Sequence, residues 1–153
     1  MAQPATKLRI VILVGLPGSG KSTWATGKHG VLSSDALREL LADDPTDQTI
    51  HVRVFRLLRN LLKQRLELRR PVTYVDATHL TPTERRPYLK LADSFDCEVE
   101  AIFFDVPVSE CIRRNRTRAR VVPDAVILKM AEKLIPPDVR EGFSRVTVVR
   151  PHK

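Results

Sequence analysis

The sequence has few cysteines, few aromatic residues and no long apolar run. Its only cysteines, Cys97 and Cys111, form no Cys-X-X-Cys pair and have no histidine cluster nearby, which argues against a disulfide framework or a zinc site. No apolar stretch approaches the roughly 18 to 20 residues that span a bilayer, so no membrane contact is expected. Aromatic residues make up 5% of the chain, too few to assign a base-stacking platform. We therefore expect a protein of the reducing cytoplasm.

Acidic residues are also scarce relative to basic ones. Asp and Glu number 18 against 26 Lys and Arg, which gives a net charge of +8. Such a field attracts polyanions, including nucleic acids, although a basic surface that serves only solubility gives the same count. The length of 153 residues and the absence of repeats or low-complexity linkers predict a single domain covering residues 1–153.

Short apolar runs alternate with helical patterns along the whole chain. Strands are expected at residues 8–14, 31–32, 72–75, 99–104 and 146–149. Helices are expected at residues 22–28, 34–42, 49–69, 107–118 and 123–134, with a further helix starting at residue 82. This alternation predicts an α/β fold in which a five-stranded parallel sheet has helices on both faces and binds ligands at its carboxyl edge.

A glycine-rich segment lies between the first expected strand and helix. Residues 15–22 read Gly-Leu-Pro-Gly-Ser-Gly-Lys-Ser, which matches the P-loop pattern. The alternative is a chance glycine-rich turn before a helix. In a P-loop, backbone N–H groups surround the phosphates, the lysine reaches the β and γ oxygens, and the serine binds Mg²⁺. The residues expected to bind ATP or another nucleoside triphosphate are Gly15, Pro17, Gly18, Ser19, Gly20, Lys21, Ser22 and Thr23.

Two charged residues follow the second expected strand. Asp35 and Arg38 stand one helical turn apart and therefore project to one side. A carboxylate there suits a base that takes the proton of an acceptor hydroxyl, and Arg38 suits a neighbouring acceptor phosphate. The alternative is a helix-capping Asp with an ordinary surface Arg.

Arginines crowd the segment before residue 121. The five are Arg113, Arg114, Arg116, Arg118 and Arg120, without a carboxylate among them. We expect a helical lid that brings arginines over the triphosphate, the alternative being a solvated or RNA-binding helix. At the end of the third expected strand, Asp76 is a candidate for orienting Mg²⁺ or its waters, unless it only caps the next turn.

These segments together resemble the P-loop polynucleotide 5′-hydroxyl kinase family, typified by the kinase domain of the phage enzyme and its bacterial relatives. Zeta-toxin-like P-loop kinases are more distantly similar. The resemblance covers most of the chain and rests on residues 15–24, 34–38, 76–82, 84–86, 104–107, 114–115 and 122–123. It implies transfer of phosphate from ATP, with Mg²⁺, to the 5′-OH end of DNA or RNA. The implied roles are Asp35 as general base, Arg38 on the acceptor phosphate, Lys21 and Ser22 at the donor, Arg114 as lid arginine and Arg118 as a second candidate.

The sequence departs from that family at His79, where Asn is usual. By the resemblance, Thr78 and His79 are expected to contact the acceptor. His79 also suits a group that titrates near neutrality and makes activity pH-dependent, or else a simple loop histidine. No phosphatase or ligase module accompanies these segments, so a stand-alone kinase is expected.

Three functions remain open from the sequence. The first is a polynucleotide 5′-hydroxyl kinase active in repair or RNA processing, and the second is a kinase of the same fold that acts on a sugar, nucleotide sugar or antibiotic. The third is a non-catalytic ATP-dependent RNA-binding module. The sequence leaves the choice between DNA and RNA and the oligomeric state open.

Overall fold

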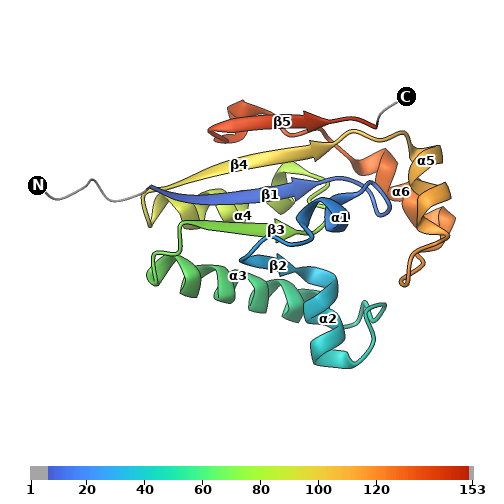
Figure 1. Ribbon diagram of the computed structural model, residues 1–153, viewed down its shortest axis with the longest axis horizontal. Coiled ribbons are helices and arrows are strands. Elements are labelled where there is room, and N and C mark those ends of the chain that lie inside the picture. Colours follow the sequence, from blue (N-terminus) through green and yellow to red (C-terminus); the bar gives the residue numbers. More distant parts are fainter. Residues whose placement is uncertain (1–6, 152–153) are drawn as a thin grey trace, which may run out of the picture.

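The fold is built on one parallel sheet. The computed structural model describes residues 7–151, and residues 1–6 and 152–153 of the expected domain lie outside the described residues. The sheet has the strand order β2-β3-β1-β4-β5 (Figure 1). The strands are β1 (Leu8–Val14), β2 (Val31–Ser33), β3 (Val72–Asp76), β4 (Cys97–Phe104) and β5 (Arg145–Val149), and every pairing is parallel. The predicted α/β class with a five-stranded parallel sheet is confirmed.

Helices cover both faces of this sheet. They are α1 (Lys21–Ala25), α2 (Ser34–Ala42), α3 (His51–Glu67), α4 (Pro82–Asp93), α5 (Val108–Asn115) and α6 (Asp124–Lys133), with a 3₁₀ turn η1 (Val139–Glu141). Helices α3 and α4 share one face, where Leu58 and Tyr88 join the main core. Helix α1 packs on the opposite face, where Ala25 and Trp24 contact the strands. Helices α5 and α6 pack together near the carboxyl edge (Figure 1).

The apolar run of β1 follows from this sandwich. Successive side chains of a strand point to opposite faces, so a strand covered on both sides is apolar throughout. Ile10 and Ile12 face α3 and α4, whereas Val11 and Leu13 face α1, and all four are buried. The carboxyl end of β1 is thereby held in the middle of the sheet, and this fixes the position of the glycine-rich segment that follows it.

Two helices start at the carboxyl edge with strong caps. The side chain of Ser33 accepts a hydrogen bond from the backbone N–H of Ala36 and caps α2. Thr81 and Glu84 form a reciprocal capping box at the start of α4, and Pro82 occupies its first turn. Such caps satisfy the free N–H groups of a helix and mark where it begins. The residues before and inside these first turns therefore have defined positions beside the glycine-rich loop.

The structure differs from the expected elements at three points. Helix α1 ends at Ala25 rather than near residue 28, and Gly27 follows in the left-handed region with φ 84°. Helix α5 ends at Asn115 rather than at residue 118, so Arg118 and Arg120 of the expected helical lid lie on a loop. The 3₁₀ turn was not expected. Within residues 7–151, no helix combines the length and the apolar character that crossing a membrane requires.

Candidate active site

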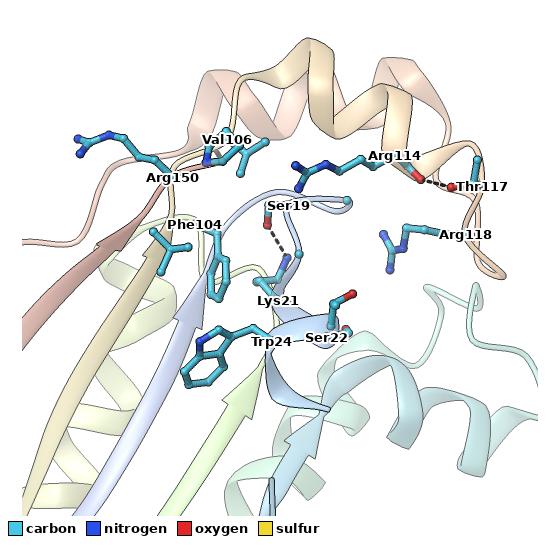
Figure 2. Close-up of a pocket in the computed structure, with 15 residues that line it drawn as sticks. Ser19, Lys21, Ser22, Trp24, Phe104, Val106, Arg114, Thr117, Arg118 and Arg150 are labelled. Carbon is cyan, nitrogen blue, oxygen red and sulfur yellow. Dashed lines mark hydrogen bonds between the residues drawn. The ribbon is translucent and has the colours of Figure 1, made fainter. Parts of the chain in front are cut away.

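The glycine-rich loop, which we call the phosphate loop, connects β1 to α1 and packs closely against α5. Gly18 has φ 83°, in the left-handed region, and a Cβ atom there would lie 2.4 Å from the carbonyl oxygen of Cys111. Gly20 has φ 100° and is the N-cap of α1. At position 18, only glycine can combine the left-handed backbone with this close approach to Cys111. Residues 18–24 line one side of a cavity of about 580 Å³ (Figure 2).

Lys21 begins α1, and its side chain turns back into this loop. Its ammonium group donates hydrogen bonds to the carbonyl oxygens of Gly15 at 2.9 Å and Leu16 at 2.8 Å, and lies 3.5 Å from Oγ of Ser19. Burial lowers the pKa of Lys21 to about 8, against the raising effect of the nearby Asp76. The loop therefore holds a compact cation whose charge is only partly compensated by neutral carbonyls, which suits an incoming phosphate.

Ser22 and Asp76 form an oxygen-rich pair beside Lys21. The hydroxyl of Ser22 donates a hydrogen bond to Oδ2 of Asp76 at 2.8 Å. Asp76 ends β3 and pairs in register with Leu13 of β1 and Ser33 of β2. Among residues 7–151, no group of three or more His, Cys, Asp or Glu side chains has the arrangement of a metal site. Mg²⁺ typically takes one or two protein oxygens together with substrate phosphates and water, so this hydroxyl and carboxylate fit it.

Arginines lie opposite Lys21 in the cavity that residues 18–24 line, which we call the donor cavity. Figure 2 shows Arg114 on α5 and Arg118 on the following loop pointing toward the phosphate loop. An Nη atom of Arg114 lies 3.8 Å from where a Cβ of Gly20 would stand, and Nε of Arg114 donates to Glu110 at 2.8 Å. Hydrogen bonds from Arg113 and Arg114 lower the pKa of Glu110 to about 2. Glu110 therefore stays ionised and holds Arg114 over the loop.

Asp35 lies in the first turn of α2 and has three arginine neighbours. Its Oδ1 accepts hydrogen bonds from Arg38 at 3.2 Å and from Arg120. Its Oδ2 lies 3.8 Å from Arg118. About a third of the side chain is exposed, so its position is set by these charged partners rather than by packing. The Asp35–Arg38 pair expected from the spacing is present, and two arginines of the loop extend it.

Arg38 is almost entirely buried, with a side-chain exposure of 4%. Burial lowers its pKa, and the neighbouring Arg120 lowers it further. The guanidinium stays charged, because an arginine side chain keeps its proton throughout the physiological pH range. Its Nε has no hydrogen-bond partner among the described residues. A buried, partly unpaired guanidinium is costly, and an anionic ligand would supply the missing acceptor.

A second cavity of about 550 Å³ is lined by residues of α2, α3, α6 and the loops beside them. Asp35, Arg38 and Thr78 form part of its polar lining, and its apolar lining includes Phe55, Val122 and Met130. A narrow space of about 50 Å³ between the two cavities is lined by residues of both. It brings together Lys21, Ser22, Asp35, Asp76, Thr78 and Arg118. Residues predicted from four separate segments thus meet at one place.

His79 does not have the position expected of an acceptor-binding residue. It is buried beneath β1, its Nδ1 lies 2.6 Å from the carbonyl oxygen of Leu13, and it is absent from the lining of both cavities. Burial lowers the pKa of His79 to about 4. The side chain is therefore neutral at physiological pH, and the hypothesis that it titrates near neutrality is wrong. With φ 48°, its backbone adopts a conformation that Asn tolerates better than most residues.

The sequence predicted no role for two buried polar residues that support the site. The guanidinium of Arg85 donates to both carboxylate oxygens of Glu141 and, at 2.8 Å, to the carbonyl oxygen of His79. The amide of Asn115 bonds to the backbone carbonyl and N–H of Val122, which closes the arginine loop at its base. The partner of Arg85 lies 56 residues away and follows from the fold, whereas Asn115, where the sequence pattern predicted a continuing helix, bonds to a residue seven positions further on. Glu110 was also missed, although its i, i+3 and i, i+4 spacing to two arginines predicts ion pairs.

Comparisons with known proteins agree with this architecture. The profile of a family described as "AAA domain" matches residues 10–137. L-seryl-tRNA(Sec) kinase from Methanococcus maripaludis is 28% identical over 145 residues, which cover 88% of this chain and 55% of that protein. A chain in the structure of the Pnkp1/Rnl/Hen1 complex matches with TM-score 0.62 and 22% identity over 80% of this chain. A gluconokinase from Sinorhizobium meliloti matches with TM-score 0.56 and 21% identity over 97% of this chain.

The extent of these matches sets what they establish. The chain spans 55% of the seryl-tRNA kinase and 43% of the chain in the Pnkp1 complex, but 84% of the gluconokinase. The finer assignment to the polynucleotide kinases stays a prediction, whereas the family profile covers most of the chain. The parallel sheet, the phosphate loop after β1 and this profile lead to one conclusion: the chain belongs to the AAA domain family and has a P-loop kinase fold.

Proposed function

We propose that this protein transfers the γ-phosphate of ATP, or of another nucleoside triphosphate, to the 5′-hydroxyl end of a DNA or RNA strand. The observation that carries the proposal is the position of Asp35. Its carboxylate lines both the narrow space beside Lys21 and Ser22 and the second, larger cavity of about 550 Å³, which we call the acceptor cavity. An acceptor hydroxyl in that cavity would have a carboxylate beside it and the phosphate loop behind it.

The donor side would bind the triphosphate through the phosphate loop. Backbone N–H groups of residues 15–23 and the ammonium of Lys21 would contact the β- and γ-phosphates. Ser22 and Asp76 would hold Mg²⁺, which supplies positive charge to the phosphate oxygens when bound. Arg114, fixed by Glu110, would add charge over the transferring group.

The transfer itself would be an in-line displacement. The acceptor 5′-oxygen forms a bond to the γ-phosphorus while the bond from that phosphorus to the β,γ-bridging oxygen breaks, and ADP leaves. The hydroxyl proton passes to Asp35. Arg118 lines the donor cavity and also lies 3.8 Å from Asp35. A triphosphate offers Arg118 a more strongly charged partner, so nucleotide binding would weaken the ion pair between Arg118 and Asp35.

Arg38 would bind an acceptor phosphate next to the reacting hydroxyl. Its buried Nε has no partner among the described residues, and the side chain lines the acceptor cavity. The apolar lining of the cavity, including Phe55, Val122 and Met130, suits the flat face of a nucleobase. The net charge of +8 favours a polymeric anion over a small neutral acceptor. Both the seryl-tRNA kinase and the Pnkp1 complex bear names tied to nucleic acids or polynucleotide processing.

A small-molecule kinase is the second candidate. The gluconokinase matches nearly the whole of this chain and most of its own length. A cavity of about 550 Å³ also has a size that suits a small acceptor. In that case Arg38 would hold a carboxylate or phosphate of the metabolite instead of a strand.

An acceptor panel separates the two candidates. The protein is incubated with Mg²⁺, labelled ATP and either a 5′-OH oligonucleotide, a nucleoside or a set of sugars including gluconate. Label on the oligonucleotide supports the proposal. Label on a sugar alone overturns it in favour of the second candidate, and acceptor-independent ATP hydrolysis alone overturns both.

Two variants assign the roles at the acceptor. Asp35→Asn should lower kcat by about a hundredfold with little change in ATP affinity, because it removes only the proton acceptor. Asp96→Asn, in the exposed turn between α4 and β4, is the matched control and should leave kcat unchanged. Arg38→Ala should raise KM chiefly for acceptors that carry a phosphate beside the hydroxyl. An equal rise for all acceptors would contradict the role of Arg38.

A further inference from the structure

A basic groove lies between α3 and α4, outside both cavities of the active site. Its volume is about 710 Å³. Five basic residues line it: Arg56, Arg59 and Lys63 from α3, and Arg86 and Lys90 from α4. The lining contains neither an acidic nor an aromatic side chain. We call this feature the α3–α4 groove.

The charge of the α3–α4 groove is largely uncompensated. Within residues 7–151, only Lys63 of the five has an ion-pair partner, Glu67 at 3.9 Å, and both side chains are about half exposed. Such exposed pairs are weak. Glu84 of α4 is engaged in the capping box with Thr81 and does not line the groove. Five cations gathered in this way repel one another and attract an anion.

The spacing of these residues indicates an extended anion. On α3 the basic residues follow at i, i+3 and i+7, and on α4 at i and i+4, so each set shares one side of its helix. The α3 set spans about 10 Å along the helix axis. Two rows of cations of that length suit several phosphates of a strand better than a single phosphate. The lack of aromatic side chains indicates contact with phosphates rather than stacking with bases.

The α3–α4 groove starts beside the acceptor cavity. His51 and Phe55 in the first turns of α3 line that cavity, and Arg56 follows directly in the groove. Helix α4 begins just after the loop that carries Thr78, which also lines the cavity. Figure 1 shows both helices starting at the side where the strand arrows end and running back along the sheet. A strand whose end occupies the acceptor cavity would therefore meet the groove next.

We propose that the α3–α4 groove binds the phosphate backbone of the acceptor strand, beyond the 5′ end that is placed beside Asp35. The placement of that end rests on the proposed function, whereas the affinity of the groove for a strand does not. Contact is with phosphates and is therefore independent of base sequence and steeply dependent on salt. An acidic protein segment would match the charge too, but the continuity with the acceptor cavity favours the strand.

The kinetic test compares long and short acceptors. Arg56→Gln combined with Lys90→Gln removes one cation from each wall, and Lys129→Gln with Lys133→Gln removes two exposed cations from α6 as the matched control. The groove variant should raise KM about tenfold for a 5′-OH oligonucleotide of roughly ten nucleotides and leave KM for a nucleoside 3′-phosphate unchanged. The control should change neither value. Equal effects of both variants, or a KM rise for the short acceptor as well, would overturn the proposal.

A binding test needs no catalysis. The fluorescence anisotropy of a labelled oligonucleotide is followed at several salt concentrations, and the groove variant should reduce the salt slope by about two, one for each cation removed. Binding through the groove without phosphorylation would support this inference while the proposed function fails. If the groove variant phosphorylates the oligonucleotide as well as the parent does, the proposed function would stand and this inference would fail. Stronger binding of a polyglutamate peptide than of the oligonucleotide would overturn the inference in favour of a protein partner.

Discussion

The proposed donor and acceptor sides of the site differ in the range of the contacts that position their key side chains. On the donor side, Lys21 donates to carbonyl oxygens five and six residues away within one short loop. The cavity it faces is also lined by residues of β4, α5, β5 and the segments that follow them. On the acceptor side, Asp35 meets Arg120 across 85 residues of sequence, and the cavity draws on α2, α3, α6 and four loops. The hydrogen bonds of Lys21 are therefore determined by local conformation, and the surroundings of Asp35 by long-range packing and charge. Substitutions should accordingly disturb the two sides differently.

Removing the lysine of the donor side should have the largest effect. We expect Lys21→Ala to lower kcat/KM roughly a thousandfold with every acceptor, because the charge on the transferring phosphate loses its nearest cation. The measurement is the initial rate with the oligonucleotide and with a short acceptor. Lys133→Ala, an exposed lysine on α6, is the control. A loss limited to one acceptor class would show that Lys21 also serves the acceptor side.

Removing the Arg85 side chain, which links α4 to Glu141 and to the loop before α4, should chiefly affect stability. Arg85 is fully buried and bonds to Glu141 and to the loop that carries Thr78. We expect Arg85→Ala to lower the free energy of unfolding by about 3 kcal/mol, since it leaves buried acceptors without partners. Urea denaturation measures this loss. The exposed neighbour Arg86→Ala should stay within about 0.5 kcal/mol of the parent, and a similar loss in both variants would contradict this role of Arg85.

Acid should destabilise the fold through His79. Burial lowers its pKa to about 4, whereas the unfolded chain has the ordinary value near 6.5. Protons therefore favour the unfolded chain, and stability is lost as pH falls from about 6.5 toward 4, by about 2 kcal/mol at pH 5. His79→Asn fits the left-handed backbone and should make this slope shallower. His29→Asn, at an exposed site, should leave it unchanged, and unfolding curves at several pH values distinguish the two variants.

The pH dependence of nucleotide affinity should give the smallest effect. Burial lowers the pKa of Lys21 to about 8 in the ligand-free protein, and bound phosphates would raise it again. Affinity for ATP should be constant below pH 8 and then weaken by up to about tenfold per pH unit as the lysine loses its proton. Titration calorimetry from pH 7 to about 9.5 measures this change. An affinity that stays flat across this range would mean that the ammonium is not in contact with the phosphates.

The sequence predicted the sheet and most of the helices because their signals are local. The apolar run of β1, the caps at Ser33 and Thr81 and the glycines of the phosphate loop each act on a few neighbouring residues. The wrong environment of His79 has the opposite origin, because its contact with the carbonyl oxygen of Leu13 joins residues 66 positions apart. The helix end after Asn115 depends on the bonds of its amide to Val122, seven residues further on, which form only when the loop between them folds back.

By itself, the sequence determined a parallel α/β sheet with a phosphate loop after its first strand, because hydrophobic periodicity and glycine backbone freedom act over short distances. Only the tertiary structure decided that Asp35 lies between two cavities, that His79 is buried and neutral, and that basic residues of α3 and α4 line a common groove. These features depend on which helices share a face of the sheet. That choice is made by packing against β1, where side chains distant in sequence exclude water together.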